Sequence, residues 1–215
     1  MVQDIFLSGL LGYLLGCLNP SLLIAKFKKK DLRNEGTNNL GATNTFLLLG
    51  KWMGAIVLVF DVSKSYLSIR LADMLFPQYA FAGVVAGAFS IIGHMFPFYL
   101  RFYGGKGLAC LGGVVLGLQW NVFFPILLIG LLLAVITNFT CAVPFSAATL
   151  FPIVYGISTE SRFCFAVLFI ACVCVIIKHF ENIGRVRNGT ELPFRDFLKD
   201  HFCEREISAY ENSRQ

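Results

Sequence analysis

The chain has 215 residues, of which 56% are hydrophobic and 14% charged, and its formal net charge is +5. Soluble domains carry about 25% charged residues, so this chain lacks the charges that a soluble surface needs. Its abundance of large apolar side chains excludes an intrinsically disordered chain. Its basic residues are not interleaved with a polar fold, which excludes a soluble nucleic-acid binder. The composition predicts an all-α membrane helix bundle that crosses the bilayer several times.

Cysteine usage agrees with this class. The chain has seven cysteines, an odd number, and several lie inside apolar runs: Cys17, Cys164, Cys172 and Cys174. We expect small buried hydrophobic residues rather than a disulfide framework.

Residues 5–25 contain no charged side chain and are long enough to cross a bilayer, for which about 20 residues are needed. They follow Asp4 rather than a basic region, and no small-residue cleavage site comes after them. We therefore expect the first transmembrane helix here rather than a cleavable signal peptide.

Basic residues predict the orientation of the chain. They cluster after the first helix at 26–33, again at 101–106, and again at 178–187. The positive-inside rule places all three clusters in the cytoplasm, and the N-terminus outside. The number of crossings between neighbouring clusters must therefore be even.

Two crossings, near residues 46–72 and 79–98, fit between the first and second clusters, although the former carries several charged residues. Between the second and third clusters, two or four crossings fit the long charge-free stretch. Four are favoured by breaks near Trp120–Asn121, Thr137–Asn138 and Ser158–Arg162. The total is then about seven transmembrane helices. We expect one transmembrane domain over residues 1–191 and a polar cytoplasmic tail of short helix and coil over residues 192–215.

Three polar segments lie at the predicted cytoplasmic face. The first, residues 35–44, reads EGTNNLGATN. A turn followed by Thr43 or Asn44 capping a helix that starts near Thr45 would explain one of these side chains. A loop so rich in amides and hydroxyls beside a helix N-terminus suits an anion or a polar head group.

The second segment, residues 93–107, ends in Gly-Gly-Lys-Gly. Glycines tolerate the backbone angles that let amide groups converge on a phosphate, and Lys106 would add a positive charge. An ordinary glycine turn is the alternative. Leu108 follows Gly107, where a P-loop would have serine or threonine, so the segment is not a P-loop. For His94, a structural and a functional role both remain open.

The third segment, residues 178–191, carries His179 and Asn182, which share one face of a helix. Histidine is the side chain best suited to accept a proton near neutral pH. The alternative is an interfacial helix end whose basic residues touch lipid phosphates. The three segments together favour an enzyme that transfers a group between a lipid-like donor and a phosphorylated soluble acceptor. They do not suit a pore, because residues 107–159 carry no charge.

The three segments resemble, in the same order, the signature motifs of the bacterial acyl-phosphate-dependent glycerol-3-phosphate acyltransferases. The resemblance covers residues 12–191. It is carried by residues 36–44, then by Gly93, His94, Phe96, Pro97, Gly104, Gly105, Lys106, Gly107 and Ala109, and then by His179, Asn182, Ile183, Arg185, Gly189 and Glu191. Asp61 and Lys64 also match a family pattern, with Ser65 in place of a glycine.

This resemblance implies a multi-pass enzyme of the bacterial inner membrane, with seven spans, the N-terminus outside and the active site toward the cytoplasm. It implies transfer of a fatty acyl group from acyl-phosphate to the 1-hydroxyl of glycerol-3-phosphate. The products are lysophosphatidic acid and phosphate, in the first step of phospholipid synthesis. The implied partners are these two substrates and membrane lipids, with no metal, no coenzyme A and no nucleic acid. The oligomeric state is not implied.

The resemblance also implies residue roles. Lys106 and the amides of Gly104, Gly105 and Gly107 would hold a phosphate. Thr37, Asn39, Gly41 and Thr43 would position the substrates. His179 and Asn182 would orient the attacking hydroxyl, with either His179 or the donor's own phosphate taking its proton.

Some positions depart from the family pattern. Leu47 stands where the family has an arginine, Tyr103 where a lysine is common, and Cys110 where a threonine is common. Lys51, one turn beyond Leu47, is a candidate replacement for the missing cation. The departures leave two alternatives open, a divergent acyltransferase with another acceptor and a non-catalytic lipid-binding paralogue.

Overall fold

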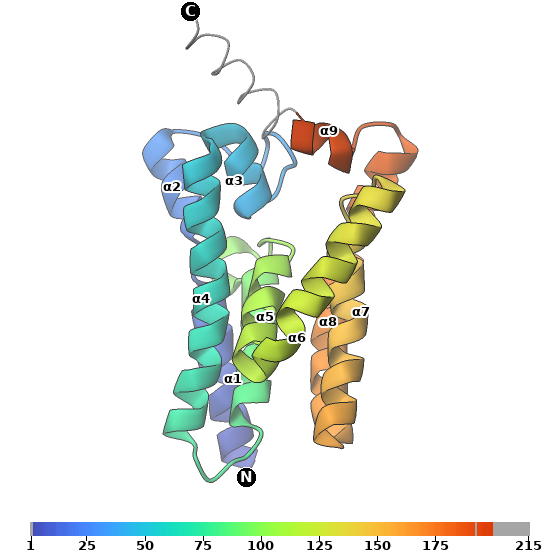
Figure 1. The fold of residues 1–215 in the computed structure, drawn as a ribbon. Coiled ribbons are helices and arrows are strands. Elements are labelled where there is room, and N and C mark those ends of the chain that lie inside the picture. Colours follow the sequence, from blue (N-terminus) through green and yellow to red (C-terminus); the bar gives the residue numbers. More distant parts are fainter. Residues whose placement is uncertain (1, 192, 200–215) are drawn as a thin grey trace, which may run out of the picture.

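The computed structural model describes residues 2–191 and 193–199. All regular structure in these residues is helical, as the composition predicts (Figure 1). In chain order the elements are α1 (Val2–Cys17), α2 (Pro20–Lys28), α3 (Ala42–Leu49), α4 (Lys51–Leu75), α5 (Ala82–Met95), η1 (Phe98–Leu100), α6 (Leu108–Thr137), α7 (Ala142–Thr159), α8 (Arg162–Arg187) and α9 (Phe194–Leu198).

The first predicted span is broken into two helices. Residues 5–25 are not one continuous helix, because α1 ends at Cys17 and α2 begins at Pro20. The side chain of Asn19 accepts a hydrogen bond from the Leu22 amide at 3.1 Å and so caps α2. Pro20 lacks an amide hydrogen and suits the first helical position. By length and hydropathy, Val2–Lys28 still forms one candidate membrane span.

Five segments of the described chain are long and apolar enough to cross a membrane. They are Val2–Lys28, Ala82–Leu100, Leu108–Thr137, Ala142–Thr159 and Arg162–Arg187. The 25-residue α4 is also long enough, at about 1.5 Å of rise per residue, but it carries charged residues along its length. The prediction of seven spans therefore stays a prediction.

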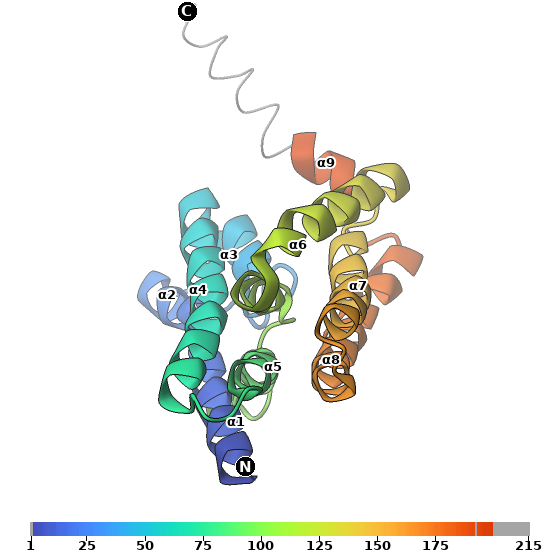
Figure 2. The same ribbon diagram turned by 60° about the horizontal axis from the view of Figure 1, so that its bottom comes forward.

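The three breaks expected between residues 107 and 162 coincide with irregular backbone. Gln119 has non-helical angles (φ −154°, ψ 74°) inside α6, and Asn138 ends that helix in the left-handed conformation. Glu160 ends α7 in the same conformation. Figures 1 and 2 show α6 changing direction within its length, and its second half rises toward α9.

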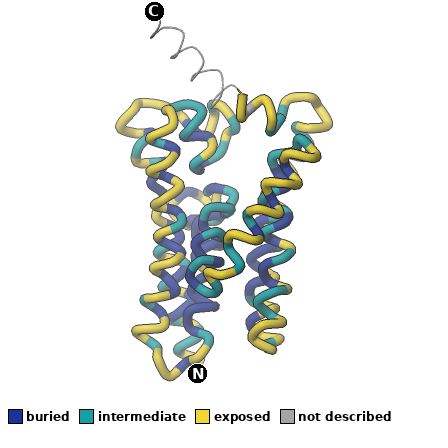
Figure 3. The backbone as a smooth tube through the Cα atoms, viewed as in Figure 1, coloured by how far each residue is buried: buried dark blue, intermediate teal, exposed yellow. Residues whose placement is uncertain are grey.

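The helices are arranged around a space between two groups. Figure 1 shows α1, α4 and α5 on one side and the second half of α6, α7 and α8 on the other, with the first half of α6 between them. The N-terminus lies at one end of the molecule, and α2, α3 and α9 lie at the opposite end. Figure 3 shows buried residues gathered where helices face one another and exposed residues on the outer surface.

Small residues allow α1 and α5 to pack closely. A Cβ added at Gly12 would lie 2.0 Å from the carbonyl oxygen of Ala86, and one added at Gly16 would lie 2.2 Å from that of Ser90. Close backbone approach through glycine is the usual way in which membrane helices associate, because lipid supplies no hydrophobic drive between them.

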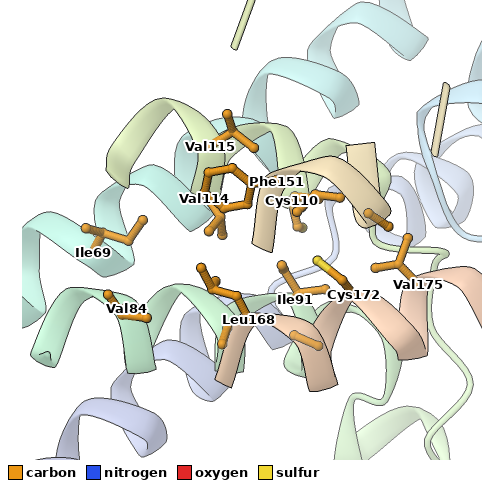
Figure 4. Close-up of a cluster of buried hydrophobic side chains, with 14 of the residues drawn as sticks. Ile69, Val84, Ile91, Cys110, Val114, Val115, Phe151, Leu168, Cys172 and Val175 are labelled. Atoms are coloured by element: carbon orange, nitrogen blue, oxygen red, sulfur yellow. The ribbon is translucent and has the colours of Figure 1, made fainter. Parts of the chain in front are cut away.

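The main apolar core joins five helices. Figure 4 shows Ile69 of α4, Ile91 of α5, Val114 of α6, Phe151 of α7 and Leu168 of α8 in one cluster. All five are fully buried. The cysteines of the described residues are free thiols, mostly buried, so the prediction of small buried hydrophobic residues is confirmed.

Most of the predicted tail, residue 192 and residues 200–215, lies outside the described residues. The described part includes α9, which contacts the end of α6. The backbone amide of Arg195 donates to Asn138 Oδ1 at 2.8 Å, and its guanidinium donates to the carbonyl oxygen of Val135.

Candidate active site

A cavity of about 660 Å³ lies between the two groups of helices. Much of its polar lining comes from residues 36–43, from the segment at 106–107 and from the C-terminal part of α8, and Asp61, His94, Thr140 and Glu191 add to it. Its apolar lining includes Leu58, Val62, Leu111, Val115, Phe123, Ile126 and Leu127. A single space therefore offers polar groups and an apolar wall.

Most of the predicted site residues meet in this cavity. Its lining includes Thr37, Asn39, Gly41, Thr43, Lys106, Gly107, His179 and Asn182. Gly104 instead lines a second cavity, and Gly105 lines neither. Three segments that are far apart in the sequence are thus brought together.

Asn44 holds the first segment in shape. It is fully buried, and its Oδ1 accepts from the Thr37 amide at 2.8 Å. Its Nδ2 donates to the carbonyl oxygens of Leu32 and Glu35 at 2.9 and 3.1 Å. The alternative considered for this segment, a cap by Thr43 or Asn44 on a helix starting near Thr45, does not hold. The helix begins at Ala42, and its N-cap makes no side-chain hydrogen bond.

The glycine segment turns back onto the end of α5. The amide of Gly104 donates to the Met95 carbonyl at 3.0 Å, and that of Gly105 donates to the His94 carbonyl at 3.1 Å. These two amides are therefore engaged within the protein. Gly107, at φ +84°, leads into α6, whose N-terminus lines the cavity. A helix N-terminus favours an anion, since its first amides lack intrahelical partners.

The third segment forms a polar network around Glu191. Lys106 Nζ donates to Asn182 Oδ1, and Asn182 Nδ2 donates to Glu191 Oε1 at 2.6 Å. The other carboxylate oxygen accepts from Arg185 Nε at 2.6 Å. Thr140 Oγ1 donates to Glu191 Oε1 at 3.0 Å. Glu191 was not among the predicted site residues, although it closes the third motif.

The network sets the charges of its members. Burial raises the pKa of the Glu191 carboxyl, but hydrogen bonds from Arg185 and Asn182 outweigh burial and hold this pKa below its usual value. Burial, assisted by the charge of Arg185, lowers the pKa of Lys106. Glu191 is therefore an anion at neutral pH that holds the amide contacting Lys106.

His179 has the geometry of a proton acceptor. It is 6% exposed, and its Nδ1 lies 2.8 Å from the carbonyl oxygen of Val175. Because a carbonyl only accepts, Nδ1 carries the proton. In the neutral ring, Nε2 is then left with a free lone pair, on a side chain that lines the cavity.

A second group of ionisable residues is almost completely buried beside the cavity. Lys64 Nζ lies 2.6 Å from Asp61 Oδ1 and 2.9 Å from His94 Nδ1. Asp61, His94 and Cys110 are also the group of potential metal ligands found in the described part of the chain, with ligand atoms within 4.8 Å of one another. The ammonium of Lys64 already places a cation among them.

The cation missing at Leu47 is not replaced by Lys51. Leu47 belongs to α3 and lines the cavity, whereas Lys51 opens α4, is exposed and lines neither cavity. The break at Gly50 separates the two helices, so the two side chains do not share a helix face as the sequence suggested. That hypothesis is wrong.

A second cavity of about 910 Å³ adjoins the first. Its lining includes three guanidinium-bearing residues, Arg33, Arg101 and Arg185, and one carboxylate, Glu181. Thr37 and Arg185 line both cavities. The excess of positive charge favours an anionic ligand.

The fold and the site together define an integral membrane protein in which an apolar wall meets a cationic, hydrogen-bonding site. Comparison with known proteins identifies the family within this class. Residues 6–189 match the glycerol-3-phosphate acyltransferase family. The chain belongs to this family and is a membrane acyltransferase, as the three motifs predict.

Relatives and solved structures agree. A glycerol-3-phosphate acyltransferase of Coxiella burnetii is 35% identical over 86% of this chain and 95% of its own length. That of Exiguobacterium sibiricum is 38% identical over 89% and 94%. The crystal structure of PlsY (YgiH) in its glycerol 3-phosphate form is 31% identical, with a TM-score of 0.77 over 88% of this chain and 95% of that one. The lysophosphatidic acid form gives 0.78 at 27% identity, over 90% and 96%.

Proposed function

We propose that this protein transfers a fatty acyl group from acyl-phosphate to the 1-hydroxyl of glycerol-3-phosphate, giving lysophosphatidic acid and phosphate. The observation that carries the proposal is the cavity in which an apolar wall meets Lys106, Asn182 and His179. The solved relatives in glycerol 3-phosphate and lysophosphatidic acid forms support the acceptor and the product.

The donor, which has an apolar acyl chain and a charged phosphate, matches the apolar and the polar parts of the cavity. Its acyl chain would lie against the apolar lining contributed by α4 and α6. Its phosphate would lie at Lys106 and the N-terminus of α6, where a positive charge and unpaired amides meet. Acyl-phosphate is a mixed anhydride with a good leaving group, so holding the reactants together and stabilising charge supplies much of the catalysis.

The transfer balances without a further reactant. The acceptor's hydroxyl oxygen attacks the acyl carbon, and the bond from that carbon to the phosphate oxygen breaks. Phosphate leaves with the bonding electrons. The hydroxyl proton passes to His179 Nε2 or to the departing phosphate. Asn182 contributes by holding Lys106 through its carbonyl oxygen, and Thr37, Asn39, Gly41 and Thr43 line the remaining polar wall.

The acceptor enters, on this proposal, through the second cavity. Arg33, Arg101 and Arg185 attract an anion there, and Arg185 reaches both cavities. These arginines supply positive charge that Leu47 does not. The presence of Leu47 at the cavity wall is the observation that favours the second candidate, an acyltransferase with a less charged acceptor.

The same proposal includes the topology. The chain would cross a bacterial inner membrane seven times, through α1 with α2, α4, α5, each half of α6, α7 and α8. The N-terminus would lie outside and the active site would face the cytoplasm. The opposite placement of the N-terminus and α9 supports an odd number of crossings.

Phosphate release from palmitoyl-phosphate by the purified protein tests the reaction, with and without glycerol-3-phosphate. We expect acceptor-dependent release, its loss in His179→Ala, and its retention in Cys174→Ala. Cys174 is a matched control because it lies on the same helix and lines neither cavity. Acceptor-independent binding of donor without release would favour another acceptor. Neither binding nor release would favour the lipid-binding paralogue.

A further inference from the structure

The buried group formed by Asp61, Lys64 and His94 demands an explanation. These side chains are 1%, 3% and 4% exposed, on helices that pack inside the bundle. Burying a charge costs several kcal/mol unless it is paired and hydrogen-bonded. Ionisable residues in such surroundings are rare and mark functional sites by default.

Lys64 is held by three polar neighbours. Its Nζ donates to the Leu18 carbonyl oxygen at 2.6 Å and lies 2.9 Å from His94 Nδ1. It also forms an ion pair with Asp61 Oδ1 at 2.6 Å, although this carboxylate oxygen has no partner with hydrogen-bond geometry among the described residues. His94 Nδ1 also lies 3.5 Å from Asp61 Oδ1. An ammonium only donates, so in the contact with Lys64 the imidazole Nδ1 accepts, and the proton of a neutral ring then lies on Nε2.

The position of Nε2 follows from the glycine beside it. A Cβ added at Gly105 would lie 2.1 Å from His94 Nε2, so this nitrogen lies against the backbone of the glycine segment. Lys106 is the next residue. Among the residues that the structure describes, His94 Nε2 has no hydrogen-bond partner, and the small exposed part of His94 lies at the wall of the main cavity.

We propose that His94 is a further substrate-contacting residue, whose Nε2–H, oriented by Lys64 and Asp61, donates a hydrogen bond to a phosphate group bound in the main cavity beside Lys106. The inference rests on the proposed function for the identity of the ligand. The acyl-phosphate donor and the glycerol-3-phosphate acceptor both carry the phosphate group that His94 would contact. Lys64 and Asp61 act as positioning residues, because Lys64 holds the imidazole of His94 and Asp61 balances the positive charge of Lys64.

Two substitutions separate this role from a structural one. In His94→Asn, the amide oxygen takes the place of Nδ1 and keeps the partner of Lys64, but no donor reaches the cavity. In His94→Gln, the amide nitrogen takes the place of Nε2 and keeps the donor, but Lys64 loses a partner. Ser90→Ala is the matched control, since Ser90 is buried on α5 one turn earlier, bonds within its own helix and lines neither cavity.

Thermal unfolding with and without inorganic phosphate tests the site independently of catalysis. A ligand that binds only the folded state raises the unfolding temperature. We expect phosphate to raise it in the wild-type protein, Ser90→Ala and His94→Gln, and not in His94→Asn. An equal rise in His94→Asn, or none in the wild-type protein, would overturn the proposal. Stabilisation by phosphate without acyl transfer would refute the proposed function and leave this site standing.

Steady-state kinetics give the second readout. We expect His94→Asn to lower kcat/KM at least tenfold while its unfolding temperature stays near that of the wild-type protein. We expect His94→Gln to be the less stable of the two and the more active. A merely structural role predicts that the more stable variant is also the more active one. Higher activity in His94→Asn than in His94→Gln would therefore refute the proposal. A rise in the KM for palmitoyl-phosphate or for glycerol-3-phosphate identifies whose phosphate His94 contacts.

Discussion

At the scale of single residues, the site depends on one carboxylate. Glu191 accepts from Asn182, Arg185 and Thr140, and Asn182 in turn accepts from Lys106. The direction of the Lys106 side chain therefore depends on a residue two contacts away. A carboxylate that accepts several charge-assisted hydrogen bonds is difficult to replace by an amide, which offers one acceptor oxygen.

We predict that Glu191→Gln destabilises the protein by about 1–3 kcal/mol, the range for leaving a buried donor unsatisfied, and lowers kcat/KM at least tenfold. Thermal unfolding and the phosphate-release assay measure the two effects. Glu160→Gln is the control, because Glu160 is exposed at the end of α7 and lines neither cavity. Its activity should stay within about twofold of the wild-type value. Equal losses in both variants would refute the special role of Glu191.

The low pKa of Glu191 adds a pH dependence. A carboxyl whose pKa is lower in the folded state than its ordinary value of 4.5 stabilises the fold above that value and ceases to do so as pH falls through the folded pKa. The stability difference between the wild-type protein and Glu191→Gln should therefore be constant from pH 8 to about 5 and shrink below about 4.5. A difference that shrinks already between pH 8 and 6 would contradict this.

The sequence predicted much of the site at this scale because its motifs concentrate rare polar groups in an apolar chain. Thr37, Lys106, His179 and Asn182 all reach one cavity. The pattern could not show which partner each group takes. Asn44 looked like a helix cap and instead binds the loop before it. The hydrogen bonds of Gly104 and Gly105 to α5 depend on a chain reversal that residue types alone do not specify.

At the scale of helices, glycine decides how closely α1 and α5 approach. At Gly12 an added Cβ would lie 2.0 Å from a backbone oxygen of α5, whereas at Gly9 the nearest atom is a side-chain carbon of Phe89 at 3.5 Å. A backbone atom cannot move aside as a side chain can. The two positions lie one turn apart on the same helix and differ only in what they face.

We predict that Gly12→Ala destabilises the protein by about 1–3 kcal/mol, the usual cost of overpacking, while Gly9→Ala does not, because alanine favours helix by up to about 1 kcal/mol over glycine. Thermal unfolding in one detergent compares the two variants. Similar unfolding temperatures would mean that α1 and α5 separate easily.

The sequence predicted helix positions better than helix continuity. Charge-free runs locate spans because lipid excludes charge, and the breaks at Gln119, Asn138 and Glu160 fall where polar residues interrupt those runs. The break at Asn19–Pro20 was missed, since neither residue is charged and the run continues past them. The opposite difficulty arises at α4, where charged residues obscure a helix long enough to cross the membrane. Two of them, Asp61 and Lys64, pair with each other inside the bundle.

At the scale of the whole molecule, the kink in α6 decides how many times the chain crosses the membrane. If each half of α6 is a separate crossing, then the kink lies outside and the loop between α6 and α7 lies in the cytoplasm. If α6 crosses only once, then the loop between α6 and α7 lies outside the cell. Since Thr140, which follows α6, contacts Glu191, the first arrangement keeps the whole site at one face.

We predict that single cysteines placed at the exposed residues Asn121 and Glu160 react with a membrane-impermeant maleimide added to intact cells, in a chain whose native cysteines are replaced. A cysteine at the exposed Thr137 should react only after the membrane is permeabilised, because this residue would lie on the cytoplasmic side, which the reagent does not reach in intact cells. One at Lys29, in the basic cluster, is the cytoplasmic control. Reaction at Thr137 in intact cells, with Lys29 protected, would show that α6 crosses once and would separate Thr140 and Glu191 from the cytoplasmic face.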